Sequence, residues 1–461
     1  MDRRNLGRLL KAISSSKDEK PVGIKKRFCP LTSINAIMIK KYLSLLLLFS
    51  ILPLTAKEIE TPNVILIFTD DQGYNDLGCY GSKTNKTPNL DKMAQEGMRF
   101  TDFYVGSSFC SPSRAALLTG CYPGRIGFGP GVLRPDADYG LAKNEFTMAE
   151  MFKSKGYATK CIGKWHIGFK KPFLPQAQGF DEYFGIRHNM DPKEIDDFDG
   201  VMPLYRNEKV IEILDTPAEL TELYTKEAID FISKNKKKPF FLYLPHTMAH
   251  KPLAVTKRFE GKSEGGLYGD VVECLDWSTG EIIKALKEHK LDKSTIVLYT
   301  TDNGGYNKNN APLRAGKGSS WEGGMRVPAI VWGPGLIPSG KVVNDIASTV
   351  DLMPTFANWL DVSLPNAIDG QNISDLLSGK ENAGREYFHY FEGIIGTAIR
   401  DKRWKLHKNI HGDYLLYDLK KDIGESKNVL LENKDVANRL SKKLLDYEAE
   451  LGKNRRVAER L

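Results

Sequence analysis

Short apolar runs rich in β-branched residues alternate along most of the chain with longer stretches of helical hydrophobic periodicity. The short runs predict buried strands, and the longer stretches predict amphipathic helices. The predicted strands are residues 64–69, 157–162, 240–244, 295–300 and 327–332. The predicted helices are residues 89–96, 147–154, 219–235, 270–288 and 351–360. This alternation is typical of an α/β domain whose largely parallel sheet is covered by helices on both faces.

The pattern changes near residue 384. Residues 398–407 and 414–419 have the composition of short strands joined by turns, and a basic amphipathic helix is predicted near residues 436–451. We therefore expect a main domain over residues 57–383 and a smaller C-terminal α+β domain over residues 384–461. The smaller domain would contain an antiparallel sheet.

A leader precedes the predicted main domain. Residues 38–56 begin with lysines, continue with about 13 apolar residues, and end with the small residues Thr55 and Ala56. This is the form of a secretory signal peptide, and it is too short to span a membrane. We expect cleavage near Ala56, a periplasmic or secreted protein, and no stable membrane anchor. Residues 1–37 have no clear pattern, and we interpret them as a non-native extension upstream of a start at Met38.

The net charge of +8 comes from this leader. Residues 1–56 contain 11 lysines and arginines against 3 acidic residues, and the rest of the chain is neutral. A general attraction to polyanions is therefore not indicated, and we expect no nucleic-acid partner.

Five cysteines follow the leader: Cys79, Cys110, Cys121, Cys161 and Cys274. Their spacing contains no CxxC pair, so a zinc finger or zinc ribbon is not expected. An odd number of cysteines in an exported protein leaves one thiol without a partner, and Cys110 is our candidate for it. The other four are compatible with two disulfides or with none.

Two similar segments place acidic and amide residues directly after a buried strand. The first is VILIFTDDQGYN from Val64, and the second is IVLYTTDNGGYN from Ile296. The carboxyl ends of parallel strands open on one edge of a sheet, where ligands bind. The oxygen donors of these segments suit Ca²⁺ or Mg²⁺ better than zinc or copper. Asx turns that end the strands are the alternative for each segment taken alone. The four predicted metal ligands are Asp70, Asp71, Asp302 and Asn303.

The segment CSPSRAALLTG, residues 110–120, predicts a short helix with a cysteine at its N-terminus. Pro112 suits the first turn, and Gly120 suits the position after the last turn. Arg114 adds a positive charge to a helix end that already favours anions. Cys110 is therefore a candidate nucleophile or the precursor of one. A small buried apolar cysteine is the alternative.

These motifs resemble those of the type I, formylglycine-dependent sulfatases. CSPSRAALLTG fits the pattern C-x-P-x-R-x-x-x-L/M-T-G of that family. The similarity extends from about residue 61 to about residue 428. It includes DDQG (70–73), GKWHIG (163–168), DNG (302–304), GKGSSWEGGMRVP (316–328) and the C-terminal LYDL and ESKN. The resemblance implies an alkaline phosphatase-like fold, with a large mixed, mostly parallel sheet between helices and a small antiparallel sheet in the C-terminal domain.

The resemblance also implies the chemistry. A maturation enzyme would oxidise Cys110 to formylglycine, whose hydrate attacks the sulfate sulfur and forms a covalent sulfo-enzyme. Loss of a proton from the second hydroxyl would then expel sulfate. One Ca²⁺ would lie on Asp70, Asp71, Asp302 and Asn303, beside the group derived from Cys110.

The remaining roles follow from the resemblance and from charge. Arg114 and Lys164 would hold the diol and the sulfate, and His166 would act as the base in the elimination. His250 and Lys317 would face and protonate the leaving-group oxygen. His246, four residues before His250, is a rival for that position. Arg125, Trp165 and Glu322 are interpreted as structural support.

One segment of the sequence is a candidate for substrate specificity. The segment Arg187, His188 and Asn189 departs from the pattern expected in close relatives, and these residues are candidate contacts to a sugar or to sulfate. A surface loop with ordinary polar residues is the alternative.

We therefore predict an exported sulfatase whose substrate is a sulfated oligo- or polysaccharide. The formylglycine-generating maturation enzyme would be a protein partner. A phosphonate or phosphate monoester hydrolase of the same superfamily is the nearest alternative, because the two oxyanions differ mainly in charge. A protein that binds sulfated glycans without catalysis is the second alternative.

Overall fold

The computed structural model describes residues 61–189, 202–306, 310–409 and 411–461. The predicted leader and upstream extension, residues 1–56, lie outside these ranges. In the described part of the chain no helix is both long and apolar enough to cross a membrane.

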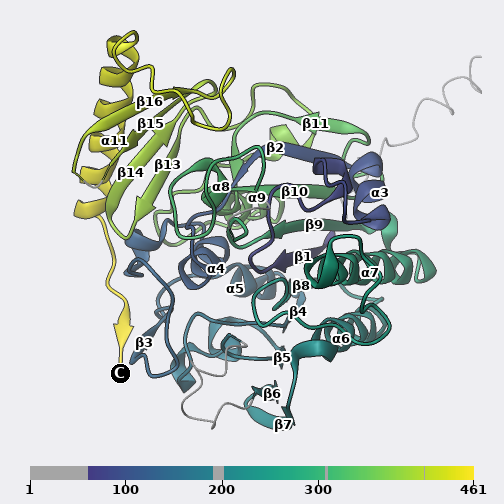
Figure 1. The fold of residues 1–461 in the computed structure, drawn as a ribbon. Coiled ribbons are helices and arrows are strands. Elements are labelled where there is room, and N and C mark those ends of the chain that lie inside the picture. Colours follow the sequence, from purple (N-terminus) through teal and green to yellow (C-terminus); the bar gives the residue numbers. More distant parts are fainter. Residues whose placement is uncertain (1–60, 190–201, 307–309, 410) are drawn as a thin grey trace, which may run out of the picture. The chain divides into compact units, whose positions relative to one another are not determined.

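An 11-stranded mixed sheet forms the centre of the part that the structure describes (Figure 1). Its strand order is β11-β2-β10-β9-β1-β8-β4-β5-β6-β7, with β12 paired to β2. The five strands predicted from the sequence are β1 (Asn63–Thr69), β4 (Ala158–Ile162), β8 (Phe240–Pro245), β9 (Thr295–Thr301) and β10 (Arg326–Trp332). The sequence pattern did not predict β2 (Met98–Tyr104), β5 (Glu182–Gly185), β6 (Met202–Arg206), β7 (Lys209–Leu214), β11 (Lys341–Val343) or β12 (Ala347–Ser348).

The middle of the sheet is parallel, as expected. Strands β9, β1, β8, β4 and β5 all run in one direction, whereas β10 is antiparallel to both of its neighbours. The register pairs Thr69 with Thr301 at the carboxyl ends of β1 and β9. The residues that follow these two strands therefore emerge side by side at one edge of the sheet.

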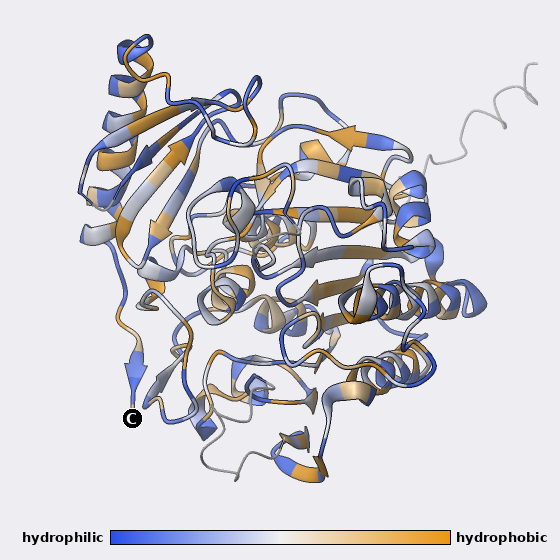
Figure 2. Ribbon diagram, viewed as in Figure 1, coloured by the Kyte–Doolittle hydropathy of each residue, from blue (hydrophilic) through white to orange (hydrophobic). Residues whose placement is uncertain are grey.

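Helices cover both faces of the sheet. Side chains of β1 alternate between two apolar clusters, because successive residues of a strand point to opposite faces. Ile65 and Ile67 pack with α3 (Pro88–Glu96), α6 (Leu220–Lys234) and α7 (Gly266–Glu288). Val64 and Leu66 belong to the cluster that contains α4 (Cys110–Thr119), α5 (Met148–Ser154) and α9 (Leu352–Trp359). Figure 2 shows the hydrophobic colouring concentrated in the central strands.

A second, four-stranded sheet lies toward the C-terminus. Its antiparallel order is β13 (Phe388–Glu392), β14 (Ile395–Arg400), β15 (Trp404–Lys408) and β16 (Tyr414–Asp418). Helix α11 (Lys434–Lys453) packs on it through Leu440 and Leu444. The predicted fold class is thereby confirmed, whereas the division at residue 384 stays a prediction. The chain ends with β17 (Glu459–Arg460), which pairs with β3 (Tyr139–Gly140).

Short elements complete the described chain. The two shortest α-helices are α8 (Glu322–Met325) and α10 (Ser374–Leu377). The 3-10 turns are Gly78–Tyr80, Pro123–Ile126, Lys171–Phe173, Pro175–Gln178, Pro217–Glu219, Asp292–Ser294 and Thr349–Asp351. The five cysteines that follow the leader are all free thiols, so the structure contains neither of the two disulfides left open by the sequence.

Candidate active site

A buried acidic cluster lies where β1 and β9 end. Side-chain ligand atoms of Asp70, Asp71, Cys110 and Asp302 all lie within 4.8 Å of one another, and in the described part of the chain this is the one group with such geometry. Asn303 joins them, because its amide donates to Asp71 Oδ1 at 2.7 Å. Residues more than 200 positions apart are thus brought together by the register of two parallel strands.

The donor atoms of the cluster fit a hard cation. Asp71 Oδ2 and Asn303 Oδ1 are both buried, and neither accepts a hydrogen bond from the described residues. A buried polar atom without a partner costs free energy unless a ligand satisfies it. Carboxylate and amide oxygens are the ligands that Ca²⁺ and Mg²⁺ prefer. Asp70, Asp71, Asp302 and Asn303 can therefore hold a divalent metal ion.

Cys110 is the first residue of α4, as the sequence predicted. The helix ends at Gly120, whose φ of 71° lies in the left-handed region. Cys110 Sγ is fully buried, 3.1 Å from Lys317 Nζ and 3.5 Å from Asp70 Oδ1. Burial and the nearby Asp70 carboxylate raise the pKa of the Cys110 thiol to about 12. The unmodified thiol is therefore neutral near pH 7 and a poor nucleophile.

Two cations stand on the inner side of the cluster. Arg114 donates to Asp302 Oδ2 from Nε at 3.0 Å and from Nη2 at 2.7 Å. Lys164 Nζ lies 2.5 Å from Asp70 Oδ2. Burial alone would raise the pKa of Asp70, but the charges of Lys164 and Arg114 outweigh it and lower that pKa below its usual range. Asp70 is therefore ionised, and the two cations remain beside a site that accepts anions.

Lys317 and His250 approach the cluster from another side. Lys317 Nζ lies 2.6 Å from Asp71 Oδ1, and His250 Nε2 lies 3.6 Å from Asp71 Oδ2. Burial lowers the pKa of His250. Burial opposes the charge of Lys317, but Cys110 and Asp71 outweigh it and raise the pKa of Lys317 well above its usual value. Lys317 is therefore a cation that carries a proton a leaving group could use, whereas neutral His250 must first be protonated, because its Nδ1 lies 2.6 Å from the carbonyl oxygen of Lys251.

His166 is buried deeper, beside Lys164 in the chain. Its Nε2 lies 3.1 Å from the carbonyl oxygen of Leu133, and its backbone has a φ of 62°. Burial and the charge of Lys164 lower the pKa of His166 well below its usual value, so the ring is neutral. A neutral imidazole can accept a proton, and the predicted role of His166 as a base stays a prediction.

His246 belongs to a different environment. It directly follows β8 and lies outside any helix, and its ring packs near Tyr224 while Nε2 lies 3.5 Å from Ser278 Oγ. Helices α6 and α7, not the acidic cluster, surround it. Trp165 is buried and donates to the carbonyl oxygen of Phe173, which agrees with a packing role.

Acid should destabilise the protein partly through His246. Burial lowers its pKa to about 3, whereas the unfolded chain has the ordinary value near 6.5. As the pH falls from about 6.5 toward 3, the unfolded state therefore binds more protons at His246 than the folded state does. The free energy of unfolding, which is unaffected by His246 above the unfolded pKa, decreases over this range. Between pH 7 and pH 5 the loss from His246 alone is about 2 kcal/mol.

Urea unfolding of the wild type and of His246→Gln at both pH values measures this contribution. Other groups titrate equally in the two proteins, so they cancel in the difference. Equal losses in the two proteins would contradict the assignment.

The predicted substrate contacts line a cavity of about 230 Å³. Arg187 lies over the ring of Tyr205, with 3.9 Å between its guanidinium carbon and the ring centroid. The His188 ring is 4.9 Å from that of His166, so the cavity begins next to the catalytic candidates. Sequence reasoning missed the other walls of the cavity, because no motif marks them. They are Pro135, Phe169, Lys170, Ile186, Met202, Pro203 and Tyr205.

A buried oxygen-rich cluster, a cysteine at a helix N-terminus and five cationic or imidazole side chains lie together where β1 and β9 end, an arrangement suited to cleaving anionic esters. Residues 62–362 match the Sulfatase family, and residues 316–450 match the family described as N-sulphoglucosamine sulphohydrolase, C-terminal. The chain belongs to the sulfatase family and is a sulfuric ester hydrolase. The resemblance predicted from the sequence motifs is therefore confirmed.

Two proteins of similar sequence are sulfatases, and a solved structure has a similar fold. Arylsulfatase A of Homo sapiens is 37% identical over 423 residues, which cover 80% of this chain and 83% of the relative. N-acetylgalactosamine-6-sulfatase of Canis lupus familiaris is 36% identical over 376 residues, covering 76% and 72%. The crystal structure of Ps i-CgsB in complex with k-i-k-neocarrahexaose has a TM-score of 0.77 and 30% identity, covering 87% of this chain and 95% of that one.

Proposed function

We propose that the protein is an exported sulfatase that hydrolyses sulfate esters of a carbohydrate. Residue 110 would carry formylglycine made by a maturation enzyme, and Ca²⁺ would lie on the acidic cluster. The observation that carries this proposal is the position of Cys110, with its Sγ 3.1 Å from Lys317 Nζ and beside Asp70. The neutral thiol would not be effective there, whereas the hydroxyl of a hydrated aldehyde is a suitable nucleophile.

The proposed role of each side chain follows from its charge. Arg114 and Lys164 would hold the sulfate by charge-assisted hydrogen bonds, since both are cationic and buried. Bound Ca²⁺ would draw charge from the sulfate oxygens. Lys317 would donate a proton toward the leaving oxygen, His250 would do the same when protonated, and neutral His166 would accept a proton when sulfate departs. Water is kept away because the cluster residues are at most 1% exposed.

Several observations support a carbohydrate substrate outside the cytoplasm. Ps i-CgsB was crystallised with a carrahexaose. A solved structure with 28% identity and a TM-score of 0.76 belongs to the metabolism of multiple glycosaminoglycans by Bacteroides thetaiotaomicron. The cavity at Arg187, His188 and Asn189 provides polar and aromatic groups next to His166, which suits the binding of a sugar. The predicted signal peptide agrees with an exported enzyme.

A matched pair of aryl esters distinguishes this proposal from its nearest rival. Phosphonate monoester hydrolase of Agrobacterium radiobacter shares the fold at 20% identity, so the fold alone leaves phosphate chemistry open. We expect faster turnover of 4-nitrophenyl sulfate than of 4-nitrophenyl phosphate. The mass of the peptide containing residue 110, from protein of the native host, should correspond to the aldehyde. Unmodified cysteine there, with no turnover of either ester, would favour the binding-protein alternative.

Metal removal should lower thermal stability. A cation that binds only the folded state stabilises it by about 2.7 kcal/mol at 100 times its dissociation constant. We therefore expect a lower melting temperature after chelation and recovery on addition of Ca²⁺, measured by calorimetry. Asp71→Asn should reduce this recovery. Asp76→Asn is the matched control, because Asp76 is a buried carboxylate in the same loop that accepts from Gly73 N and Tyr268 but lies outside the cluster. Equal recovery in both variants would contradict the assignment.

A further inference from the structure

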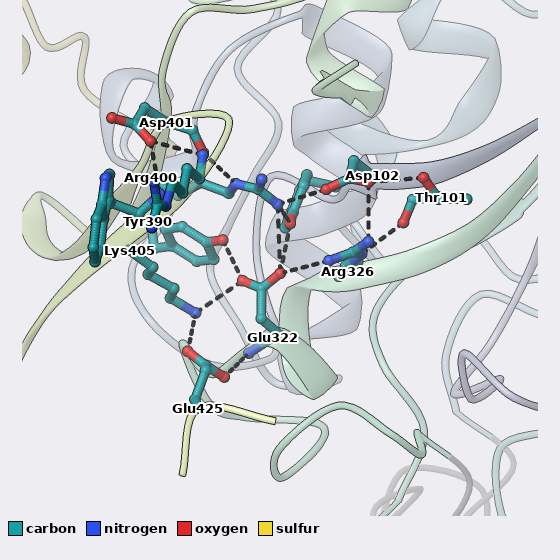
Figure 3. A network of polar contacts seen from close by, with 12 residues as sticks. Thr101, Asp102, Glu322, Arg326, Tyr390, Arg400, Asp401, Lys405 and Glu425 are labelled. Carbon is teal, nitrogen blue, oxygen red and sulfur yellow. Dashed lines mark hydrogen bonds and ion pairs between the residues drawn. The ribbon is translucent and has the colours of Figure 1, made fainter. Parts of the chain in front are cut away.

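A buried polar network connects the loop that carries Lys317 to the C-terminal sheet (Figure 3). We call residues 313–324, which run into the first residues of α8, the Lys317 loop. Glu322, at the end of this loop, accepts from Lys405 Nζ at 3.0 Å and from the Tyr390 hydroxyl at 2.6 Å. Lys405 Nζ also lies 2.8 Å from Glu425 Oε1. Lys405, Glu322 and Glu425 are each 0% exposed.

The network is balanced in charge. Burial alone would raise the pKa of Glu322, but Lys405 and Arg400 outweigh it and lower that pKa below its usual range. A buried network of this kind is rigid when every member has a partner, and breaking one pair leaves an uncompensated charge. Its acids are Asp102, Glu322 and Glu425, and its cations are Arg326, Arg400 and Lys405.

The network also holds the backbone of the Lys317 loop. Lys405 Nζ donates to the carbonyl oxygen of Ser320 at 2.7 Å, and the Glu322 amide donates to Glu425 Oε2 at 2.8 Å. Arg314, before Lys317, donates to the carbonyl oxygen of Glu425 at 2.8 Å. Lys405 of the C-terminal sheet and the segment that follows the sheet and carries Glu425 therefore hold the loop on both sides of Lys317.

The backbone of the loop is closely packed on itself. A Cβ on Gly323 would lie 2.3 Å from the carbonyl oxygen of Ala315, and one on Gly324 would lie 2.1 Å from that of Ser319. Trp321 stacks on His407 of β15, with 4.1 Å between ring centroids. A displacement at Glu322 would therefore pass to the segment that presents Lys317.

We propose that Lys405 and Glu425 are positioning residues that hold Lys317 in place at the active site. This inference rests on the proposed role of Lys317 as a proton donor to the leaving group. Neither residue touches the cluster, and both act through the Lys317 loop. The position of Lys317 Nζ matters because a misplacement of about 1 Å can cost about 10²-fold in rate.

The test variant is Lys405→Met, and the chain offers a matched control. Lys160 is also a buried lysine between two glutamates, since its Nζ lies 2.7 Å from both Glu182 and Glu227. It lies on β4 and has no contact with the Lys317 loop among the interactions that the structure describes. Lys160→Met should therefore reproduce the loss of a buried charge without moving Lys317.

Hydrogen exchange reports on the loop independently of activity. Full-length matured protein is compared below its melting temperature, after circular dichroism confirms that each variant is folded. In Lys405→Met the peptide covering residues 313–325 should exchange about tenfold faster or more, and in Lys160→Met it should match the wild type. An unchanged rate in Lys405→Met, or an equal increase in both variants, would overturn the proposal. If Lys405→Met does not fold, Glu425→Gln is measured in its place.

Kinetics then report on the proton donor. The esters 4-nitrophenyl sulfate and phenyl sulfate differ in the basicity of the leaving oxygen, so only the second depends strongly on a proton donor. Lys405→Met should lower kcat about tenfold or more on phenyl sulfate and less than about threefold on 4-nitrophenyl sulfate. Equal losses on the two esters would overturn the proposal. If Lys317→Ala itself lowers both equally, the proton-donor role is wrong, and the exchange rates alone decide whether the sheet holds the loop.

Discussion

Replacing Cys110 by alanine should abolish sulfate release while the protein stays folded. The side chain is buried in the cluster, and the proposed nucleophile derives from it. Loss of a catalytic nucleophile lowers kcat by about 10⁴-fold or more. The substitution removes one small buried atom, so we expect a loss of stability of only about 1 kcal/mol. Initial rates on 4-nitrophenyl sulfate and urea unfolding measure the two effects separately.

Cys121→Ala is the matched control for this prediction. Cys121 is buried and free like Cys110, but it lies after the end of α4, where its Sγ contacts Arg456 rather than the cluster. It should retain the activity of the wild type within about threefold. Residual activity of Cys110→Ala near the wild-type level would show that residue 110 is not the nucleophile.

Replacing Arg114 by methionine should damage both stability and activity. Arg114 is 0% exposed and bridges Asp302 at 2.7 Å and Asp70 at 3.3 Å. Without it, two buried carboxylates lose a cation, and breaking such a pair costs about 3–5 kcal/mol. Loss of a group that stabilises developing charge lowers kcat by about 10²–10³-fold. We expect chelated Arg114→Met to unfold at much lower urea, with part of the loss recovered when Ca²⁺ is added.

Arg385→Met separates the two effects. Arg385 is also buried and binds a single carboxylate, that of Asp351, at 2.6 Å. It should lose comparable stability, keep most of its activity, and gain no more from Ca²⁺ than the wild type does. If Arg385→Met lost as much activity as Arg114→Met, general instability rather than charge at the site would explain both.

The acidic cluster could be predicted from the sequence because its determinants are local. Each half is a buried strand followed at once by its ligands, and the register of parallel strands then fixes their meeting. Cys110 was equally visible, since Pro112 and Gly120 mark the two ends of its helix. In such segments the residues that mark the ends of a strand or a helix in the sequence also end it in the structure.

Other features depend on partners distant in sequence. The strand β2 carries no marker that distinguishes it from a loop, and its pairing with the distant strands β10, β11 and β12 makes it a strand. Lys405 has the sequence appearance of a solvated residue in a small sheet, yet it is fully buried because Glu322 and Glu425 neutralise it. The walls of the cavity beside His188 likewise come from separate segments.

Free sulfate released from a panel of sulfated oligo- and polysaccharides tests the central claim most directly. The enzyme is coexpressed with a formylglycine-generating partner, and Cys110→Ala serves as the blank. We predict release from at least one carbohydrate, abolished in Cys110→Ala, and this would establish the reaction and the substrate class together. If no carbohydrate in the panel releases sulfate, with the aldehyde at residue 110 confirmed by mass, this result would contradict a carbohydrate sulfatase.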